Sequence, residues 1–339
     1  MSEISAGRNP HVAAAIVPSE TLPAAQRPTM PEVWAKAVLW RPSLLVQALL
    51  ALITANVIWG TTFVATKPML ERIPPLTIAT GRFAVALLVL LPILWWRGNR
   101  PTLGRSTALL GFTGVFLVYA SQNVGLGFTS ATNGALIHGG IPVLTALIAV
   151  PMLGERLNRR NVLGIMLSIA GVVVLVLLGN GGALSLSLAG DALILLSALA
   201  LATYLVLGRR AFPHGGALEL VSGVACFGFL FLLPAAAIEL ALTGAQRPTG
   251  GDVAGLLYLG GLASALAFVL WAFGLRHFQA GQAAIFTNLS PLVGVVVAAL
   301  LLQESVSLVQ IGTGVVIVGG VWLATRRAVT GPLPSDEAT

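Results

Sequence analysis

Ten apolar stretches divide this chain, and they restrict what it can fold into. A helix needs roughly 20 consecutive apolar residues to cross the hydrocarbon core of a bilayer. Only 9% of the 339 residues are charged, whereas soluble domains carry about 25%, so the chain cannot cover a water-facing surface of the usual kind. We predict an all-α membrane protein whose ten transmembrane helices span roughly residues 44–66, 75–97, 106–126, 130–153, 161–179, 188–208, 219–242, 250–273, 281–302 and 308–325.

The two ends of the chain differ from these stretches. Residues 1–43 are polar, contain prolines and lack periodicity, which predicts a disordered N-terminal tail, and residues 327–339 are predicted to form a second tail. The apolar run 11–17 is too short, and lacks the basic residues, for a cleaved signal peptide. The single cysteine, Cys226, excludes an internal disulfide and falls in the seventh stretch.

Part of the chain occurs twice. Residues 125–172 resemble residues 274–321 at an offset of 149, which pairs Pro142 with Pro291. Further toward the N-terminus the match is weaker, and Gly81 pairs with Gly223 at an offset of 142. Each copy contains several of the apolar stretches, so the sequence predicts a duplicated membrane unit.

Ten helices in two copies give five helices per copy, and an odd number reverses the orientation of the second copy in the membrane. We therefore predict two inverted repeats, at residues 44–180 (helices 1–5) and 181–326 (helices 6–10). Inverted repeats are a common plan of secondary transporters, whose substrate sites lie where the repeats meet.

The basic residues are distributed unevenly between the two sides of the membrane. With the N-terminus inside, 15 of the 19 Lys and Arg residues fall in cytoplasmic segments, and only Lys67, Arg72 and Arg247 fall outside. Cytoplasmic loops of membrane proteins carry such an excess. The net charge of +7 therefore reflects topology and the lipid bilayer rather than a nucleic-acid partner, and we expect both termini in the cytoplasm.

Two matching prolines fall inside helices 4 and 9. Proline lacks an N–H and clashes with the carbonyl four residues earlier, which frees the carbonyls of His138 and Thr287. In hydrocarbon an unpaired carbonyl costs several kcal/mol, so each must face protein or a wet cavity. Pro142 and Pro291 are expected to kink two helices that line a central cavity and act in gating; the alternative is that the kinks serve packing alone.

Two ionisable residues lie within predicted helices. His138 either binds substrate or carries a proton, since imidazole titrates near neutral pH, or it is a neutral side chain bonded to a neighbouring hydroxyl or amide. Arg82 costs about 2.5–3.5 kcal/mol to insert, and it either reaches outward to a carboxylate or backbone carbonyls or faces the cavity and attracts an anionic substrate group. No Asp or Glu lies deep in a helix, so proton coupling would depend on His138; otherwise the protein works by exchange or downhill flux.

Other polar and aromatic side chains within the stretches could hydrogen-bond a zwitterion and stack on its apolar group, although such residues also join helices to one another. Lys67 either steers anions or extends outward to the interface. Glu155 and Glu304 end helices 4 and 9 and are expected to be structural, with local partners. The substrate-binding candidates are Asn56, Trp59, Tyr119, Gln122, Asn133, Tyr204, Trp271, Gln282, Thr287 and Asn288.

No enzyme motif is recognisable in the sequence. It has no His-Glu-x-x-His, no Cys-x-x-Cys, no P-loop and no Gly-x-Gly-x-x-Gly that opens a helix after a strand. We therefore expect no catalytic residues, no cofactor and no metal. A membrane-embedded enzyme or a sensor without flux is the alternative from a different class.

Three motifs of the first copy stand out: Trp59-Gly60-Thr61-Thr62-Phe63-x-x-x-Lys67, Arg82-Phe83, and Pro142 followed by Leu153-Gly154-Glu155-Arg156-Leu157. They resemble the motifs of the EamA domain. The second copy departs from this pattern, because Leu302-Gln303-Glu304-Ser305 replaces the Leu-Gly-Glu-Arg run and helix 6 lacks a Trp-Gly pair.

Over roughly residues 50–326 the chain is thus similar to the ten-helix branch of the drug/metabolite transporter superfamily. The resemblance implies an inverted-repeat bundle in a bacterial inner membrane that exports amino acids or related metabolites without ATP. We predict a secondary transporter of a small polar or zwitterionic metabolite, working by alternating access around a central cavity. Import or exchange of a similar solute is the nearest alternative.

Overall fold

The computed structural model describes residues 44–153, 158–178, 186–211, 216–244, 246–277, 286–287 and 289–325. Within these ranges every regular element is a helix. Eight helical segments are long and apolar enough to cross a membrane, and two shorter apolar helices, Leu289–Leu301 and Leu308–Ala324, follow them. The prediction of an all-α membrane protein with ten transmembrane helices is confirmed.

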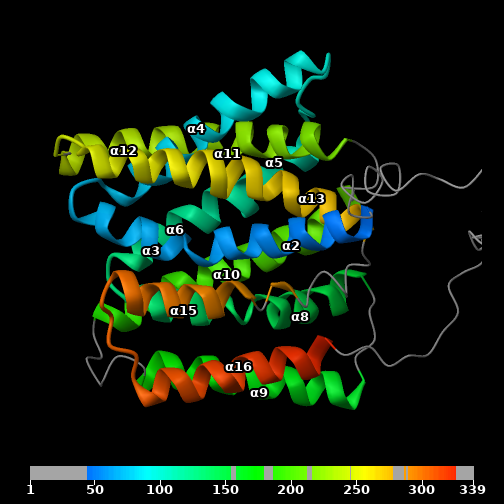
Figure 1. Ribbon diagram of the computed structural model, residues 1–339, viewed down its shortest axis with the longest axis vertical. Coiled ribbons are helices and arrows are strands. Elements are labelled where there is room, and N and C mark those ends of the chain that lie inside the picture. Colours follow the sequence, from blue (N-terminus) through cyan, green and yellow to red (C-terminus); the bar gives the residue numbers. More distant parts are fainter. Residues whose placement is uncertain are drawn as a thin grey trace, which may run out of the picture. The chain divides into compact units, whose positions relative to one another are not determined.

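The first repeat is a series of five helices, several of which are divided into consecutive segments (Figure 1). Helix 1 comprises α2 (Leu44–Gly60), α3 (Thr62–Thr66) and the 3₁₀ helix η3 (Lys67–Glu71); helix 2 is α4 (Pro75–Trp96); helix 3 comprises α5 (Arg105–Gly111), the π-helix η4 (Phe112–Leu117) and α6 (Val118–Leu126); helix 4 comprises α7 (Ala131–His138) and α8 (Ile141–Leu153); and helix 5 is α9 (Arg159–Leu178).

The second repeat follows the same order. Its predicted residues 281–285, with Gln282, and Asn288 lie outside the described residues. Helix 6 is α10 (Leu186–Ala211); helix 7 is α11 (Ala217–Thr243); helix 8 comprises α12 (Gly250–Leu257), the π-helix η6 (Tyr258–Leu266) and α13 (Ala267–His277); helix 9 contains α15 (Leu289–Leu301); and helix 10 is α16 (Leu308–Thr325).

Helices of the two repeats share their packing. Helix α2 contacts α13 and α15, and α10 contacts both α6 and α8 (Figure 1). The largest buried cluster combines Phe83, Tyr119 and Val115 of the first repeat with Tyr204 and Val224 of the second. Neither repeat therefore buries its apolar surface alone.

Helices α9 and α16, one from each repeat, pack backbone against backbone along one edge of the helices in Figure 1. A Cβ atom on Gly164 would lie 2.3 Å from the backbone nitrogen of Ala324, and a Cβ on Gly320 would lie 2.6 Å from that of Ser168. Small residues allow membrane helices to approach this closely. The two glycines therefore fix helices 5 and 10 to each other.

Helices 3 and 8 each contain a π-helix, which the sequence analysis did not predict. Adding the repeat offset of 149 to η4 gives residues 261–266, which lie within η6. A run of i→i+5 hydrogen bonds is rare and is frequently found at functional sites. The two repeats thus share an irregularity of the backbone as well as an order of helices.

Glycines beside the π-helices make matching contacts. A Cβ on Gly111 would lie 2.9 Å from the carbonyl oxygen of Val224 in α11, and a Cβ on Gly260 would lie 2.5 Å from that of Arg82 in α4. Gly111 and Gly260 are 149 residues apart, and Arg82 and Val224 are 142 apart. Helix 3 therefore packs on helix 7 as helix 8 packs on helix 2, which is what two inverted copies of one unit require.

Pro142 and Pro291 both stand next to breaks in helical structure. Helix α7 ends at His138 and α8 begins one residue before Pro142, while α15 begins two residues before Pro291. The carbonyl of Thr287, which cannot bond to Pro291, accepts a hydrogen bond from the Ser290 N–H at 3.3 Å. That carbonyl is thus satisfied within the protein.

Candidate functional site

Arg82 is a buried charge within α4, with 2% of its surface exposed. Its Nε donates to the Ser264 hydroxyl at 2.5 Å, one terminal nitrogen lies 3.5 Å from the Ala263 carbonyl, and the guanidinium carbon lies 4.3 Å from the centre of the Tyr119 ring. A cation over an aromatic face is attracted by the ring quadrupole. Arg82 is thus held by helices 3 and 8.

Three carboxylates near the outer helix ends, Glu71, Asp191 and Glu239, are the candidate partners of Arg82, and each is engaged elsewhere, Glu71 with Arg72. Glu239 accepts from the backbone of Leu76, and Asp191 accepts from the Thr129 hydroxyl at 2.5 Å. Among the described residues, no carboxylate lies within ion-pair distance of Arg82. Arg82 was expected to reach either a carboxylate or backbone carbonyls. Within the described residues it reaches only a carbonyl, that of Ala263.

An aromatic group lies beside Arg82 and shares one of its acceptors. The indole Nε1 of Trp59 donates to the Ala263 carbonyl at 3.0 Å. The Trp59 ring lies 5.3 Å from that of Phe268 in a T-shaped arrangement and 5.4 Å from that of Trp271. Because Ala263 belongs to η6, the π-helix supplies the carbonyl to which both Trp59 and Arg82 point.

Tyr119, Tyr204 and Gln122 are buried nearby in the helix packing. Tyr119 and Tyr204 belong to the same apolar cluster, and a Cβ on Gly114 of η4 would lie 2.3 Å from the Tyr204 ring. A cavity of about 10 Å³, enough for one water, is lined in part by Tyr204, Phe268 and Ser264. The amide nitrogen of Gln122, which is 3% exposed, has no hydrogen-bond partner among the described residues.

His138 lies apart from these contacts, at the C-terminal end of α7. Its Nε2 is 3.2 Å from the Ser197 hydroxyl, and its ring stands edge-on to that of Phe63 with the centroids 5.0 Å apart. This bond to a hydroxyl agrees with the second alternative for His138, a neutral side chain bonded to its neighbour. The residue as a whole is partly exposed.

The two asparagines of the predicted site lie in different surroundings. The amide of Asn56 donates to the Leu52 carbonyl of its own helix at 2.8 Å. Asn133 donates to Asp191 at 3.2 Å and accepts from Gln310 at 2.8 Å. The Asn133 contacts join three helices, which is the role that the sequence set against ligand binding, whereas Asn56 bonds within α2; neither residue contacts Arg82.

The structure therefore brings together Arg82, Trp59, Tyr119 and Trp271 of the predicted site. It adds Ser264, Ala263 and Phe268, which the sequence analysis missed. Ser264 is a small hydroxyl in an apolar stretch, and the Ala263 contact is made by its backbone, so neither gave a signal in the sequence. Phe268, close to Trp271 in the same helix, was recognisable only as an apolar residue.

Lys67 and Glu304 contact residues that are distant from them in the sequence. The Lys67 ammonium donates to the carbonyls of Leu126 at 2.7 Å and Thr129 at 2.5 Å, so it is held in place rather than free to extend outward. Glu304 accepts from the backbone of Ala131 at 2.9 Å, in another repeat. The expectation of a local partner for Glu304 is wrong, because its carboxylate binds the N-terminus of α7; Glu155 lies outside the described residues.

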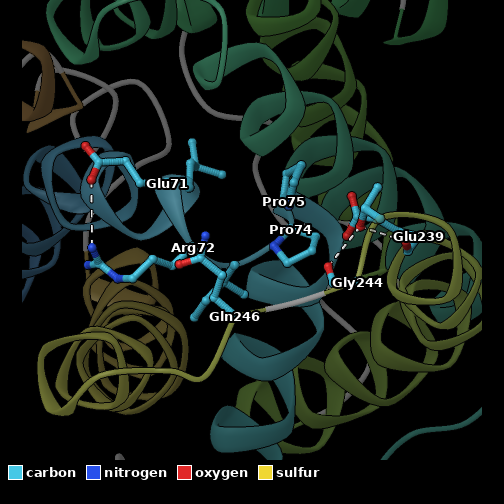
Figure 2. Close-up of a pocket in the computed structure, with 10 residues that line it drawn as sticks. Glu71, Arg72, Pro74, Pro75, Glu239, Gly244 and Gln246 are labelled. Atoms are coloured by element: carbon cyan, nitrogen blue, oxygen red, sulfur yellow. Dashed lines mark hydrogen bonds and ion pairs between the residues drawn. The ribbon is translucent and has the colours of Figure 1, made fainter.

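A larger pocket of about 480 Å³ lies at the end of the helices that the sequence predicts to face outside, the end with Lys67 and Arg247. Figure 2 shows Arg72 and Glu71 on one side of it and Glu239 on the other. Arg72 is bonded to Asp252 at 3.0 and 3.1 Å, and these bonds raise the pKa of the Arg72 guanidinium further. Glu239 caps α4. The charged groups are thus occupied in holding helices, and we do not take this pocket as the substrate site.

Comparison with known proteins gives one family. The EamA-like transporter family matches residues 46–177 and again residues 188–326. A solved crystal structure superposes with a TM-score of 0.61 at 21% identity, covering 82% of this chain and 98% of that chain, which supports the fold.

Three relatives illustrate the match. An uncharacterized transporter of Bacillus subtilis, YetK, is 30% identical over 83% of this chain and 87% of its own length. Proteins named probable amino-acid metabolite efflux pumps are 29% identical in Salmonella typhimurium, over 79% of this chain and 91% of theirs, and 27% identical in Escherichia coli, over 79% and 91%. The chain belongs to the EamA-like transporter family and is a multi-pass membrane transporter.

Proposed function

We propose that this transporter exports a small amino-acid-like metabolite whose carboxylate is bound by Arg82. The observation that carries the proposal is the burial of Arg82, whose hydrogen bonds within the described part of the chain go only to neutral groups, the Ser264 hydroxyl and the Ala263 carbonyl. An intramembrane charge is costly and marks a substrate pathway by default. An arginine without a carboxylate of its own is suited to a substrate carboxylate, because the planar guanidinium bonds it at two points.

The aromatic group beside Arg82 suits the rest of such a solute. The Trp59 indole donates to the Ala263 carbonyl, which the Arg82 guanidinium also approaches. The rings of Phe268 and Trp271 lie 5.3 and 5.4 Å from that of Trp59 and extend the aromatic surface. Rings of this kind accommodate an apolar side chain and also attract an ammonium group. The names of the Salmonella and Escherichia coli relatives agree with an amino-acid metabolite and with efflux.

Transport would proceed by rocking of the two inverted repeats around this group. Helices 4 and 9, with their breaks beside Pro142 and Pro291, would supply the hinges. The path would be lined or approached by His138, Asn133, Gln122, Tyr204 and Thr287. The excess of basic residues on one side supports an orientation with both termini on the cytoplasmic side of a bacterial inner membrane. Efflux then carries the solute toward the side of Lys67 and Arg247.

Counterflow of labelled amino acids into proteoliposomes tests this function. We expect accumulation of at least one amino acid, and Arg82→Gln should lower its apparent affinity by about 10- to 100-fold, since a hydrogen-bonded charge pair is lost. Arg105→Gln is the matched control, because Arg105 is exposed at the start of α5 and should be without effect.

Two results would oppose the proposal. An absence of counterflow across a broad panel would count against an amino-acid substrate, and equal loss in both arginine variants would remove Arg82 from the site. Efflux is separated from import by comparing right-side-out with inside-out vesicles that carry a substrate gradient.

A further inference from the structure

The Glu304 carboxylate joins helix 9 to helix 4 at the outer end of the bundle. It follows α15 in the chain and accepts hydrogen bonds from the N–H groups of Ala131 at 2.9 Å and Thr132 at 3.0 Å and from the Thr132 hydroxyl at 2.7 Å. These are free N–H groups of the first turn of α7, where a negative charge also meets the positive end of the helix dipole. One side chain therefore ties two interrupted helices of different repeats.

The N-terminus of α7 is itself fixed to helices 1 and 6. Thr129, two residues before α7, donates its hydroxyl to Asp191 of α10 at 2.5 Å, and its carbonyl accepts from Lys67 at 2.5 Å. The Ser130 hydroxyl caps α7 by accepting from the Asn133 N–H at 3.0 Å. Since this end of α7 is held by its own network, Glu304 is the contact that adds helix 9 to it.

Below Glu304, α7 and α15 touch without space for a solute. A Cβ on Gly294 would lie 2.7 Å from that of Ala135, and a Cβ on Gly139 would lie 3.3 Å from the Pro291 ring. Helix 1 closes the same level, because a Cβ on Gly60 would lie 2.6 Å from the Ser290 carbonyl oxygen. The path between helices 4 and 9 is thus shut from the breaks to Glu304.

Glu239 makes the same cap elsewhere in the molecule. It accepts from the N–H groups of Leu76 at 2.9 Å and Thr77 at 3.0 Å and from the Thr77 hydroxyl at 3.3 Å. That cap joins α11 to α4, which are continuous helices. Among the described residues, Glu304 and Glu239 thus form chemically equivalent carboxylate caps, one between broken helices and one between unbroken ones.

We propose that Glu304 is the latch of the outer gate: opening of the transporter on this side requires its carboxylate to leave the N-terminus of α7. Glu239 in contrast joins the unbroken helices α4 and α11, so its cap does not close the path between helices 4 and 9. The inference rests on the proposed alternating access of the two repeats but not on the identity of the substrate.

Labelling of a buried cysteine measures the gate directly. The reporter is Ala298→Cys in a Cys226→Ser background, because Ala298 lies on α15 with 0% exposure. The protein is reconstituted in nanodiscs, so a membrane-impermeant maleimide reaches both faces and the orientation in the membrane does not matter. We expect Glu304→Gln to raise the labelling rate by about tenfold or more, since hydrogen bonds to a charge are weakened, and Glu239→Gln to leave it unchanged.

The test compares the labelling rates of the Glu304 and Glu239 variants. An unchanged rate in Glu304→Gln, or an equal rise in Glu239→Gln, would overturn the latch. If Glu304→Gln does not yield folded protein, Thr132→Val and Thr77→Val repeat the comparison with the loss of one hydrogen bond each, and only Thr132→Val should raise the rate. The assay contains no substrate, so a failed counterflow screen leaves it intact, and a failed labelling result leaves the Arg82 site intact.

Discussion

At the scale of single residues, the two repeats have the same backbone and different chemistry. Arg82 corresponds to Val224 at the offset of 142, and Ser264 corresponds to Val115 at the offset of 149. The Arg82–Ser264 pair is hydrogen-bonded, whereas Val224 and Val115 lie in the apolar cluster. A duplicated fold thus provides one polar position and one apolar position at matching places, which suits a solute with a charged end and an apolar end.

His138 offers a test at this scale. If its imidazole carries the transported proton, His138→Ala should lose the dependence of the counterflow rate on pH between about 5 and 8 while inserting normally in the membrane. Ser197→Ala is the control, since it removes the hydroxyl 3.2 Å from the ring but keeps the imidazole, and it should retain the dependence. A pH profile that is the same in His138→Ala as in the parent protein would eliminate this role.

The sequence could identify Arg82 as a candidate because a charge in an apolar stretch stands out. It could not identify Ser264 as its partner, because the two are 182 residues apart and one hydroxyl in an apolar helix carries no signal. Glu304 shows the same limit: its position at a helix end suggested a local role, whereas its partners lie in another repeat. Tertiary contacts of single polar groups depend on how helices meet, which local patterns do not encode.

At the scale of helices, length and hydropathy were sufficient for placement, since a span must be about 20 apolar residues long. Helix 2, for example, was expected at 75–97 and is found at Pro75–Trp96. The division of helices 3 and 8 by η4 and η6 was not foreseen, because a shift from i→i+4 to i→i+5 bonding needs no distinctive residue. The break at Pro142 was foreseeable, since proline removes a hydrogen bond wherever it occurs.

The glycine contact between α9 and α16 gives a prediction for these helices. Gly320→Ala should lower the free energy of unfolding by about 1–3 kcal/mol, because the added methyl meets the backbone of Ser168 and Gly164. Its neighbour Gly319 has nothing within 4 Å, so Gly319→Ala should leave stability unchanged or slightly raised. Denaturant or thermal unfolding in detergent compares them, and equal effects would contradict the close packing.

At the scale of the whole molecule, the orientation in the membrane is the prediction to check. In a Cys226→Ser background, Gly251→Cys near the start of α12 should react with an impermeant maleimide on intact cells, and Arg100→Cys should react only after permeabilisation. Both positions are exposed. The reverse pattern would place the termini outside and reverse the direction of transport proposed above.

The π-helices have a consequence for the history of the chain. Because η4 and the end of η6 coincide when one repeat is aligned on the other, and Gly111 and Gly260 precede the aligned segments at equivalent positions, a single ancestral insertion accounts for both more simply than two separate ones. The extra residue in the helical turn would then be older than the gene duplication. On that account the irregular turn belonged to the unit that was duplicated, whereas the difference between Arg82 and Val224 came after the duplication.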